Sequence, residues 1–254
     1  MSAGRAGARL VAEPLPGVPE VRSGDDLGAQ LAAAAARLPE PGLGAADVIA
    51  VAHKVVAKAE GRVVLLADVT PGARASAVAA EHGKDPRLVE LILRESVELV
   101  RADAGRLIAR TRHGFVCANA GVDQSNAGGE AAAVLLPVDP DGSARALRAR
   151  LGCAVVISDS FGRPWRVGQA EVAIGCAGLA PVEDWRGLPD SAGRLLHATQ
   201  IAIADEVAAA ADLVRGKDTG EPAVRIRGLE RHVLDVDGPG VAALLRAPEQ
   251  DLFG

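Results

Sequence analysis

The chain has 254 residues, which is enough for one large domain or two small interlocked ones. Its formal net charge of −5 argues against a nucleic-acid coat or a polybasic membrane binder. No apolar run reaches the 18 residues of a membrane span, and no signal peptide is recognisable, so we expect a cytoplasmic protein. Aromatic residues make up only 2% of the chain, so Val, Leu, Ile and Ala must build the core.

Hydrophobic periodicity and turn residues predict helices and strands in irregular alternation. Residues 1–13 are expected to be a flexible N-terminus, 14–246 a catalytic domain that could divide into two interlocked subdomains, and 247–254 a tail. Expected helices cover 27–38, 71–82, 86–100, 143–151, 192–214 and 241–245. Expected strands cover 48–52, 107–111, 115–118, 131–138, 153–158, 172–179, 224–226 and 233–236, with 63–66 either a strand or a helix end. This order predicts an α+β fold with mixed and antiparallel sheets and packed helices.

The first candidate site follows the expected strand 115–118. Gly121 permits an unusual backbone angle, and the short oxygen-bearing side chains Asp123, Ser125 and Asn126 come next. Hard oxygen donors without Cys or His suit Mg²⁺ or Mn²⁺ better than zinc. The alternative is an Asx-type turn that caps the next element.

The second candidate site is Asp159, at the expected end of a very apolar strand, with the Ser160 hydroxyl beside it. Arg163 and Arg166 follow, and arginine suits phosphate and carboxylate recognition because its donors form a rigid fork. A capping Asp beside surface arginines is the alternative interpretation.

Two basic segments complete the candidate set. Lys58, in the expected turn 58–62 after His53 and Lys54, could serve as a point charge for a polyphosphate or simply be a surface lysine. The segment 215–221 follows the expected long helix and could wrap phosphates. It could equally be a helix end whose Gly and basic residues complement the dipole.

Several chemistries are absent from the sequence. It contains no P-loop motif and no G-x-G-x-x-G motif, so neither a P-loop nucleotidase nor a Rossmann dinucleotide site is expected. The chain has three cysteines, Cys117, Cys153 and Cys176, all in apolar runs. No two of them form a C-x-x-C pair. We interpret them as buried thiols in a reducing compartment rather than as catalytic groups.

An ordered set of segments carries a family resemblance. The segments are 55–62, 119–126, 135–144, 156–166, 204–206 and 222–229. In this order they closely resemble the coenzyme F-420-0:L-glutamate ligases, from about residue 14 to residue 230. The resemblance implies the α+β fold of that family and an intertwined homodimer.

The resemblance also implies an activity. The γ-phosphoryl group of GTP activates the terminal carboxylate of F-420-0 as an acyl phosphate, and the amine of L-glutamate attacks it. The products are an amide, GDP and phosphate, and further glutamates could be added through the γ-carboxyl. Two divalent ions, Mg²⁺ or Mn²⁺, are implied, and K⁺ is compatible by analogy, whereas nucleic-acid and membrane partners are not expected.

Site residues follow from matching positions. Asp123 and Asp159 match catalytic metal ligands, with Ser160 beside them. The positions matching nucleotide contacts are Gly17, Val18, Pro19, His53, Lys58, Asn126, Arg215, Gly216, Lys217, Asp218, Thr219, Gly220 and Glu221. Arg163 and Arg166 are expected to anchor the acidic substrates.

Some positions depart from the family pattern. Ala57 replaces a frequent Ser, Gln124 a frequent Ala and Ser160 a frequent Thr, while His53 stands where Ser or Thr is common. Ser160 keeps the hydroxyl, so we expect metal binding to be retained. His53 and Ala57 affect the details of the nucleotide contact rather than the reaction class. The tail 248–254 resembles the junction to a nitroreductase-like domain of some actinobacterial relatives, so a stand-alone ligase and a truncated product both remain open.

Two other functions remain compatible with the residues. One is a nucleotide-dependent amide ligase that acts on another carboxylate. The other is a non-catalytic relative that binds GTP or metal without turnover.

Overall fold

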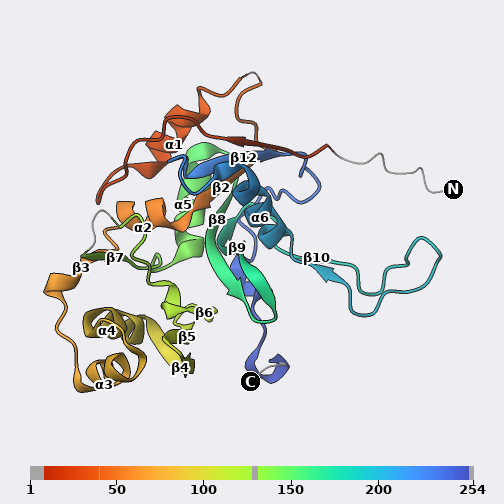
Figure 1. The fold of residues 1–254 in the computed structure, drawn as a ribbon. Helices are drawn as coiled ribbons and strands as arrows, with labels where there is room; N and C mark the ends of the chain where they lie inside the picture. Colours follow the sequence, from red (N-terminus) through yellow and green to blue (C-terminus); the bar gives the residue numbers. More distant parts are fainter. Residues whose placement is uncertain (1–8, 40, 128–130, 252–254) are drawn as a thin grey trace.

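A five-stranded sheet forms the centre of the computed structural model, which describes residues 9–39, 41–127 and 131–251 (Figure 1). Its strand order is β1-β12-β2-β8-β9. The strands are β1 (Val11–Pro14), β12 (Ala223–Arg227), β2 (Val48–Ala52), β8 (Ala154–Arg163) and β9 (Arg166–Ala177). Only β2 and β8 pair in parallel, and the other neighbours are antiparallel. The expected α+β class with mixed and antiparallel sheets is therefore confirmed.

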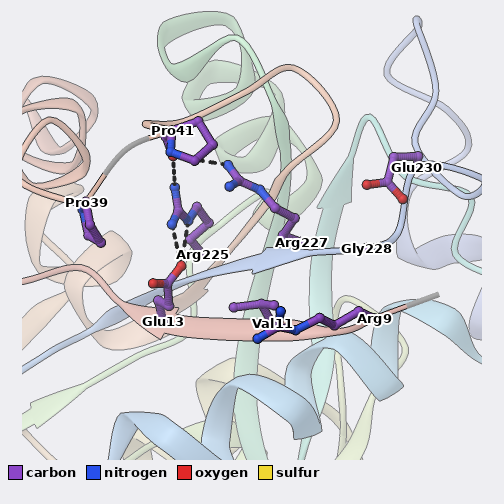
Figure 2. A pocket seen from close by; sticks show the side chains of 9 residues that line it. All are labelled: Arg9, Val11, Glu13, Pro39, Pro41, Arg225, Arg227, Gly228 and Glu230. Atoms are coloured by element: carbon purple, nitrogen blue, oxygen red, sulfur yellow. Dashed lines mark hydrogen bonds and ion pairs between the residues drawn. The ribbon is translucent and has the colours of Figure 1, made fainter.

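Helices cover both faces of this sheet. The helices α1 (Leu27–Ala35) and α5 (Pro140–Leu151) lie on one face, and α6 (Ile203–Arg215) lies on the other (Figures 1 and 2). The Asp26 side chain caps α1, and Asp139 caps α5 ahead of Pro140. β2 and residues 154–157 of β8 are wholly apolar because they are buried on both sides.

Glycine allows α5 to approach the sheet closely. A Cβ atom at Gly175 of β9 would lie 2.4 Å from the carbonyl oxygen of Pro140, the first residue of α5. No larger residue fits here without moving the helix, so the start of α5 is set directly against β9.

A second group of elements has its own cluster of buried apolar side chains, at the lower left of Figure 1. It contains α3 (Ala73–His82), α4 (Pro86–Glu95) and the antiparallel sheet β4 (Ser96–Asp103), β5 (Arg106–Thr111) and β6 (Val116–Ala118). The short strands β3 (Val63–Leu65) and β7 (Ala132–Val134) pair beside it, and α2 (His53–Ala59) leads toward it from the central sheet.

The remaining elements are short. β10 (Glu183–Asp184) pairs with β11 (Gln200–Ile201) at the base of an arm that projects from the body (Figure 1). Short 3-10 turns occur at Leu66–Asp68, Asn119–Gly121, Val241–Leu244 and Pro248–Gln250. No helix in the described part of the chain is long and apolar enough to cross a membrane.

The structure corrects several expected elements. Residues 11–13 are not frayed, because they belong to β1 and pair with β12. Residues 96–100 form a strand rather than the end of a helix, and 192–202 form turns and β11 rather than the start of α6. Residues 233–236 make only one isolated bridge, from Val233 to Leu179. Residues 1–8 and 252–254 of the expected flexible ends lie outside the described residues.

The cysteines are buried free thiols, as expected. Burial, together with a nearby carboxylate, raises the pKa of each of the three thiols to about 12. A thiol with so high a pKa is protonated at neutral pH and is a poor nucleophile.

Candidate active site

The parallel pair β2–β8 brings the first site residues together. Its register places Ala52 opposite Ser158. The residues that follow, His53 at the start of α2 and Asp159 in β8, therefore lie next to each other. The Nε2 atom of His53 lies 3.1 Å from Asp159 Oδ1, and His53 is only 2% exposed. The sequence predicted that Asp159 ends its strand, and this is wrong, because β8 continues to Arg163. Asp159 lies where β8 passes from the buried core into a protruding hairpin with β9.

Lys54, the next residue after His53, contacts the other predicted carboxylate. Its Nζ atom lies 2.7 Å from Asp123 Oδ2 and donates to the Ser125 hydroxyl at 2.6 Å. Two consecutive residues at the start of α2 thus contact Asp159 and Asp123, although these carboxylates are far apart in sequence. The two acidic segments are thus each in contact with the start of α2.

The backbone around Asp123 is tightly shaped. Asn119, Ala120 and Gly121 all have positive φ angles, and Asn126 does as well. A Cβ atom at Gly121 would lie 2.6 Å from Leu136, so the glycine meets both a conformational and a packing requirement. Backbone strain of this kind is frequent at functional sites. The Asx-type turn, which was the alternative interpretation of this segment, is present too, because the Ser125 backbone N–H donates to Asp123 Oδ1 at 2.7 Å.

Asp123 is held in its charged form. Burial tends to raise the pKa of Asp123, but hydrogen bonds from Lys54 and Ser125 outweigh it and lower that pKa below its ordinary value. An ionised carboxylate at neutral pH is what cation binding requires.

The late basic segment lies against Ser160. The Lys217 ammonium donates to the Ser160 hydroxyl at 2.7 Å, and that hydroxyl donates to Glu171 of β9. Arg215 is different from Lys217 because its guanidinium is buried and lies 2.7 Å from the Glu171 carboxylate. Of these two predicted nucleotide contacts, Lys217 is exposed and Arg215 is engaged inside the protein.

The other residues of the late segment shape its backbone. Gly216 and Gly220 have positive φ angles, and the Thr219 hydroxyl donates to the Arg215 carbonyl oxygen. The Glu221 backbone N–H in turn donates to the Thr219 hydroxyl at 3.2 Å. Asp218 is exposed.

Lys58 belongs to helix α2 rather than to a turn at a strand exit. Its Nζ atom lies 2.6 Å from Glu20, which directly follows the predicted nucleotide segment 17–19. Arg37 donates to the Gly17 carbonyl oxygen at 2.9 Å and so holds the start of that segment. Lys58 thus reaches back to the chain next to Pro19.

The predicted substrate anchors Arg163 and Arg166 lie elsewhere, at the exposed end of the β8–β9 hairpin. Arg163 donates to the carbonyl oxygens of Val167 and Gly168 within that hairpin. Asn126 is exposed beside Asp123.

The oxygen donors of the site suit a hard divalent cation, but they supply only part of its coordination shell. Within residues 9–251, apart from 40 and 128–130, no group of three or more His, Cys, Asp or Glu side chains is arranged to hold a metal ion. Asp123, Asp159 and Ser160 nevertheless offer oxygen donors, and the nearby Asn119 Oδ1 is buried without a hydrogen-bond partner. Mg²⁺ typically takes one or two protein carboxylates and completes its shell with water and substrate phosphates. The residues present fit that mode.

A cavity of about 480 Å³ lies away from these residues, and it is lined by β1, β12, Pro39 and Pro41 (Figure 2). Arg225 and Arg227 point toward Pro41 in Figure 2, and Arg225 donates to the Pro41 carbonyl oxygen at 2.9 Å. Arg227 lies 2.7 Å from the buried Asp47, and Arg225 is paired with Glu13. Because both guanidinium groups have partners within the protein, we assign this cavity to structure rather than to chemistry.

Two residues of the site were not assigned from the sequence. Lys54 lies next to His53 in the sequence, but its contact with Asp123 joins segments about 70 residues apart and cannot be recognised from neighbouring residues. The residues that flank Glu171 do not indicate a role in the site, because its place opposite Ser160 depends on the register of the β8–β9 hairpin.

Comparisons with known proteins identify the family of this chain. A family model described as "F420-0:Gamma-glutamyl ligase" matches residues 17–228. The chain is 47% identical to the coenzyme F420:L-glutamate ligase of Methanothermobacter thermautotrophicus, over 93% of this chain and 96% of that relative. It is 46% identical to the protein of the same name from Methanopyrus kandleri, over 95% and 96%. The corresponding Halobacterium salinarum protein is 43% identical over 92% of both chains.

The match spans every segment assembled above, from the turn at Gly17 to the end of β12. Both acidic segments and the late basic segment fall inside it. The chain therefore belongs to the F420-0:gamma-glutamyl ligase family.

Proposed function

We propose that this protein attaches L-glutamate to coenzyme F-420-0, using GTP, during F-420 biosynthesis. The names of its relatives support the reaction class. The observation that carries the proposal is the convergence of Asp123 and Asp159 on the consecutive residues His53 and Lys54. A structural role alone gives no reason for carboxylates from two distant segments to lie against neighbouring side chains of α2.

The proposed reaction has two balanced steps. A carboxylate oxygen of F-420-0 attacks the γ-phosphorus of GTP, and GDP leaves, which gives an acyl phosphate. The amine of L-glutamate then attacks the acyl carbon, phosphate leaves, and the amine gives up a proton. Phosphoryl transfer of this kind depends on charge neutralisation and positioning more than on a protein nucleophile.

The chain supplies both functions. Asp123, Asp159 and Ser160 would hold Mg²⁺ or Mn²⁺, and a bound divalent cation supplies neutralisation of the phosphate charge. Lys54 forms an ion pair with Asp123, and Lys217 donates to the Ser160 hydroxyl. An ammonium group that can attract a triphosphate therefore lies beside each oxygen-bearing segment. The β8–β9 hairpin and α2 are regular elements, so they hold these groups in a defined geometry.

Mass spectrometry tests the proposal directly. F-420-0 incubated with the protein, GTP, Mn²⁺ and L-glutamate is expected to gain the mass of one glutamyl residue, while GTP is converted to GDP. Omission of GTP, of glutamate or of the metal ion is expected to abolish the product. If the complete mixture yields no glutamylated product although GTP binds, the chain is a non-catalytic relative. Product from other carboxylic acids, but not from F-420-0, would instead identify a different amide ligase.

A further inference from the structure

Glu171 is a buried carboxylate at the point where three site elements meet. It lies in β9 directly opposite Ser160 of β8 and is only 4% exposed. Opposite residues of an antiparallel pair have their side chains on the same face of the sheet. The Ser160 hydroxyl accordingly donates to the Glu171 carboxylate.

The same carboxylate holds the end of α6. Arg215, the last residue of that helix, is 5% exposed, and its Nη2 atom lies 2.7 Å from Glu171 Oε2. Arg215 also donates to the Ser158 hydroxyl at 3.4 Å. A buried ion pair loses much of its stabilisation when one partner is removed, because the other charge is left without compensation. Glu171 is thus the nearer of the two carboxylates that pair with Arg215, since Asp212 lies 3.8 Å away.

Lys217 extends this arrangement to the surface. Its side chain is 68% exposed, yet its ammonium lies 3.3 Å from Glu171 Oε1 and donates to Ser160 at 2.7 Å. Between the two cations, Gly216 adopts a positive φ angle, and a Cβ atom there would lie 2.7 Å from Thr219. The backbone of the late basic segment is thus held at Arg215, folded at Gly216 and held again at Lys217.

We propose that Glu171 is a positioning residue that docks the segment 215–221 onto the β8–β9 hairpin and thereby sets the Lys217 ammonium against the Ser160 hydroxyl. The assignment of a nucleotide to this segment rests on the proposed function. The docking itself does not, because the Glu171 contacts join only residues of this chain.

Backbone amide hydrogen exchange of the protein without nucleotide or metal tests the docking. Glu171→Gln keeps the size of the side chain and removes its charge, and it is expected to speed exchange at residues 216–221 by about tenfold. Asp47→Asn is the matched control, since Asp47 is also a buried carboxylate paired with an arginine, Arg227, but lies at the start of β2. Both variants are expected to melt at lower temperature, whereas only Glu171→Gln should affect residues 216–221. Equal exchange in the two variants at these residues would overturn the docking role.

A nucleotide measurement tests the consequence. Glu171→Gln is expected to raise the Kd for GTP by about tenfold, and Lys217→Met by a similar factor. Because both changes remove the same positioned ammonium, the double variant should bind GTP no more than about twofold more weakly than either single variant. Additive losses would overturn the proposal.

Lys217→Met also keeps the test open if Glu171→Gln fails to fold, since Lys217 is exposed. Lys217→Met alone is then expected to speed exchange at residues 216–221, and unchanged exchange in that variant would refute the docking. A chain that binds no GTP would refute the proposed function but leave the exchange result valid, so the two failures are distinguishable.

Discussion

At the scale of single residues, the pair His53–Asp159 decides how the site can be tested. Asp159 is mostly buried, and its Oδ1 atom lies 3.1 Å from His53 Nε2 and accepts the Ser160 backbone N–H at 2.8 Å. An asparagine has the same shape and can still accept that backbone hydrogen bond, but it carries no charge for a cation.

Asp159→Asn is therefore expected to reduce the rate of glutamate ligation by a factor on the order of 10² or more. Its melting temperature should stay within a few degrees of the wild type. Product formation by mass spectrometry and thermal unfolding by circular dichroism measure the two quantities. Wild-type turnover by this variant would refute the role of Asp159 as a cation ligand.

A second prediction concerns Lys58, whose ammonium lies on Glu20 beside the predicted nucleotide segment 17–19. Lys58→Met is expected to raise the Kd for GTP by roughly tenfold, which corresponds to the loss of one charge-assisted contact. Lys84→Met is the control, because Lys84 follows α3 in the other group of elements. Equal GTP affinity in the wild type and Lys58→Met, measured by calorimetry, would remove Lys58 from the nucleotide site.

Short residue patterns predicted part of this site. Asp123, Asp159 and Ser160 stand beside Gly or at a change from apolar to polar residues, and such local signals can be recognised along the chain. Glu171 cannot be recognised in this way. Its partners come from β8 and the end of α6, and irregularities in the β8–β9 register shift which residues face each other.

At the scale of elements, the contact between α5 and β9 determines where the helix begins. The sequence predicted a start at Ser143, but Asp139 caps the helix and Pro140 occupies its first turn. The Pro140 carbonyl oxygen then lies directly over Gly175.

Gly175→Ala is expected to lower the free energy of unfolding by about 1–3 kcal/mol, because the added methyl group would overlap Pro140. Gly162→Ala serves as the control, since a Cβ atom there meets nothing within 4 Å. Urea denaturation measures both variants. If the two lost the same stability, the close approach of α5 to β9 would not be a packing constraint.

Elements with strong periodicity or a clear cap were predicted well. Examples are the start of α1, which Asp26 caps, and β2 with its continuous apolar run. The predicted helix 86–100 was too long because its apolar pattern continues into β4. The strand residues 96–100 are mostly exposed and pair with β5, and pairing between segments decides their conformation rather than local propensity. Alanine-rich sequence similarly extended the predicted helix 192–214 beyond its true start at Ile203.

At the scale of the whole molecule, a buried ion pair links the start of β2 to the end of β12. Burial tends to raise the pKa of Asp47, but the Arg227 guanidinium and the Gly44 backbone N–H outweigh it and lower that pKa. A carboxylate whose pKa is lowered by folding stabilises the folded protein at pH values above its unfolded-state pKa of about 3.9. This contribution is lost as the pH falls through the folded-state pKa.

Asp47→Asn should therefore be less stable than the wild type near neutral pH, and the difference should shrink as the pH falls below about 4. Urea denaturation across this pH range measures the free energy of unfolding of both proteins. A difference that stays constant down to about pH 2 would show that the charge of Asp47 does not contribute.

The place of β12 between β1 and β2 has a consequence for synthesis. β1 and β2 leave the ribosome early, yet neither touches the other in the finished sheet, because residues 223–227 separate them. The nascent polypeptide must carry two open strand edges until translation has passed Arg227. Open edges are prone to pair with other chains, so protection by chaperones during translation matters more for this protein than for one whose sheet grows in sequential order.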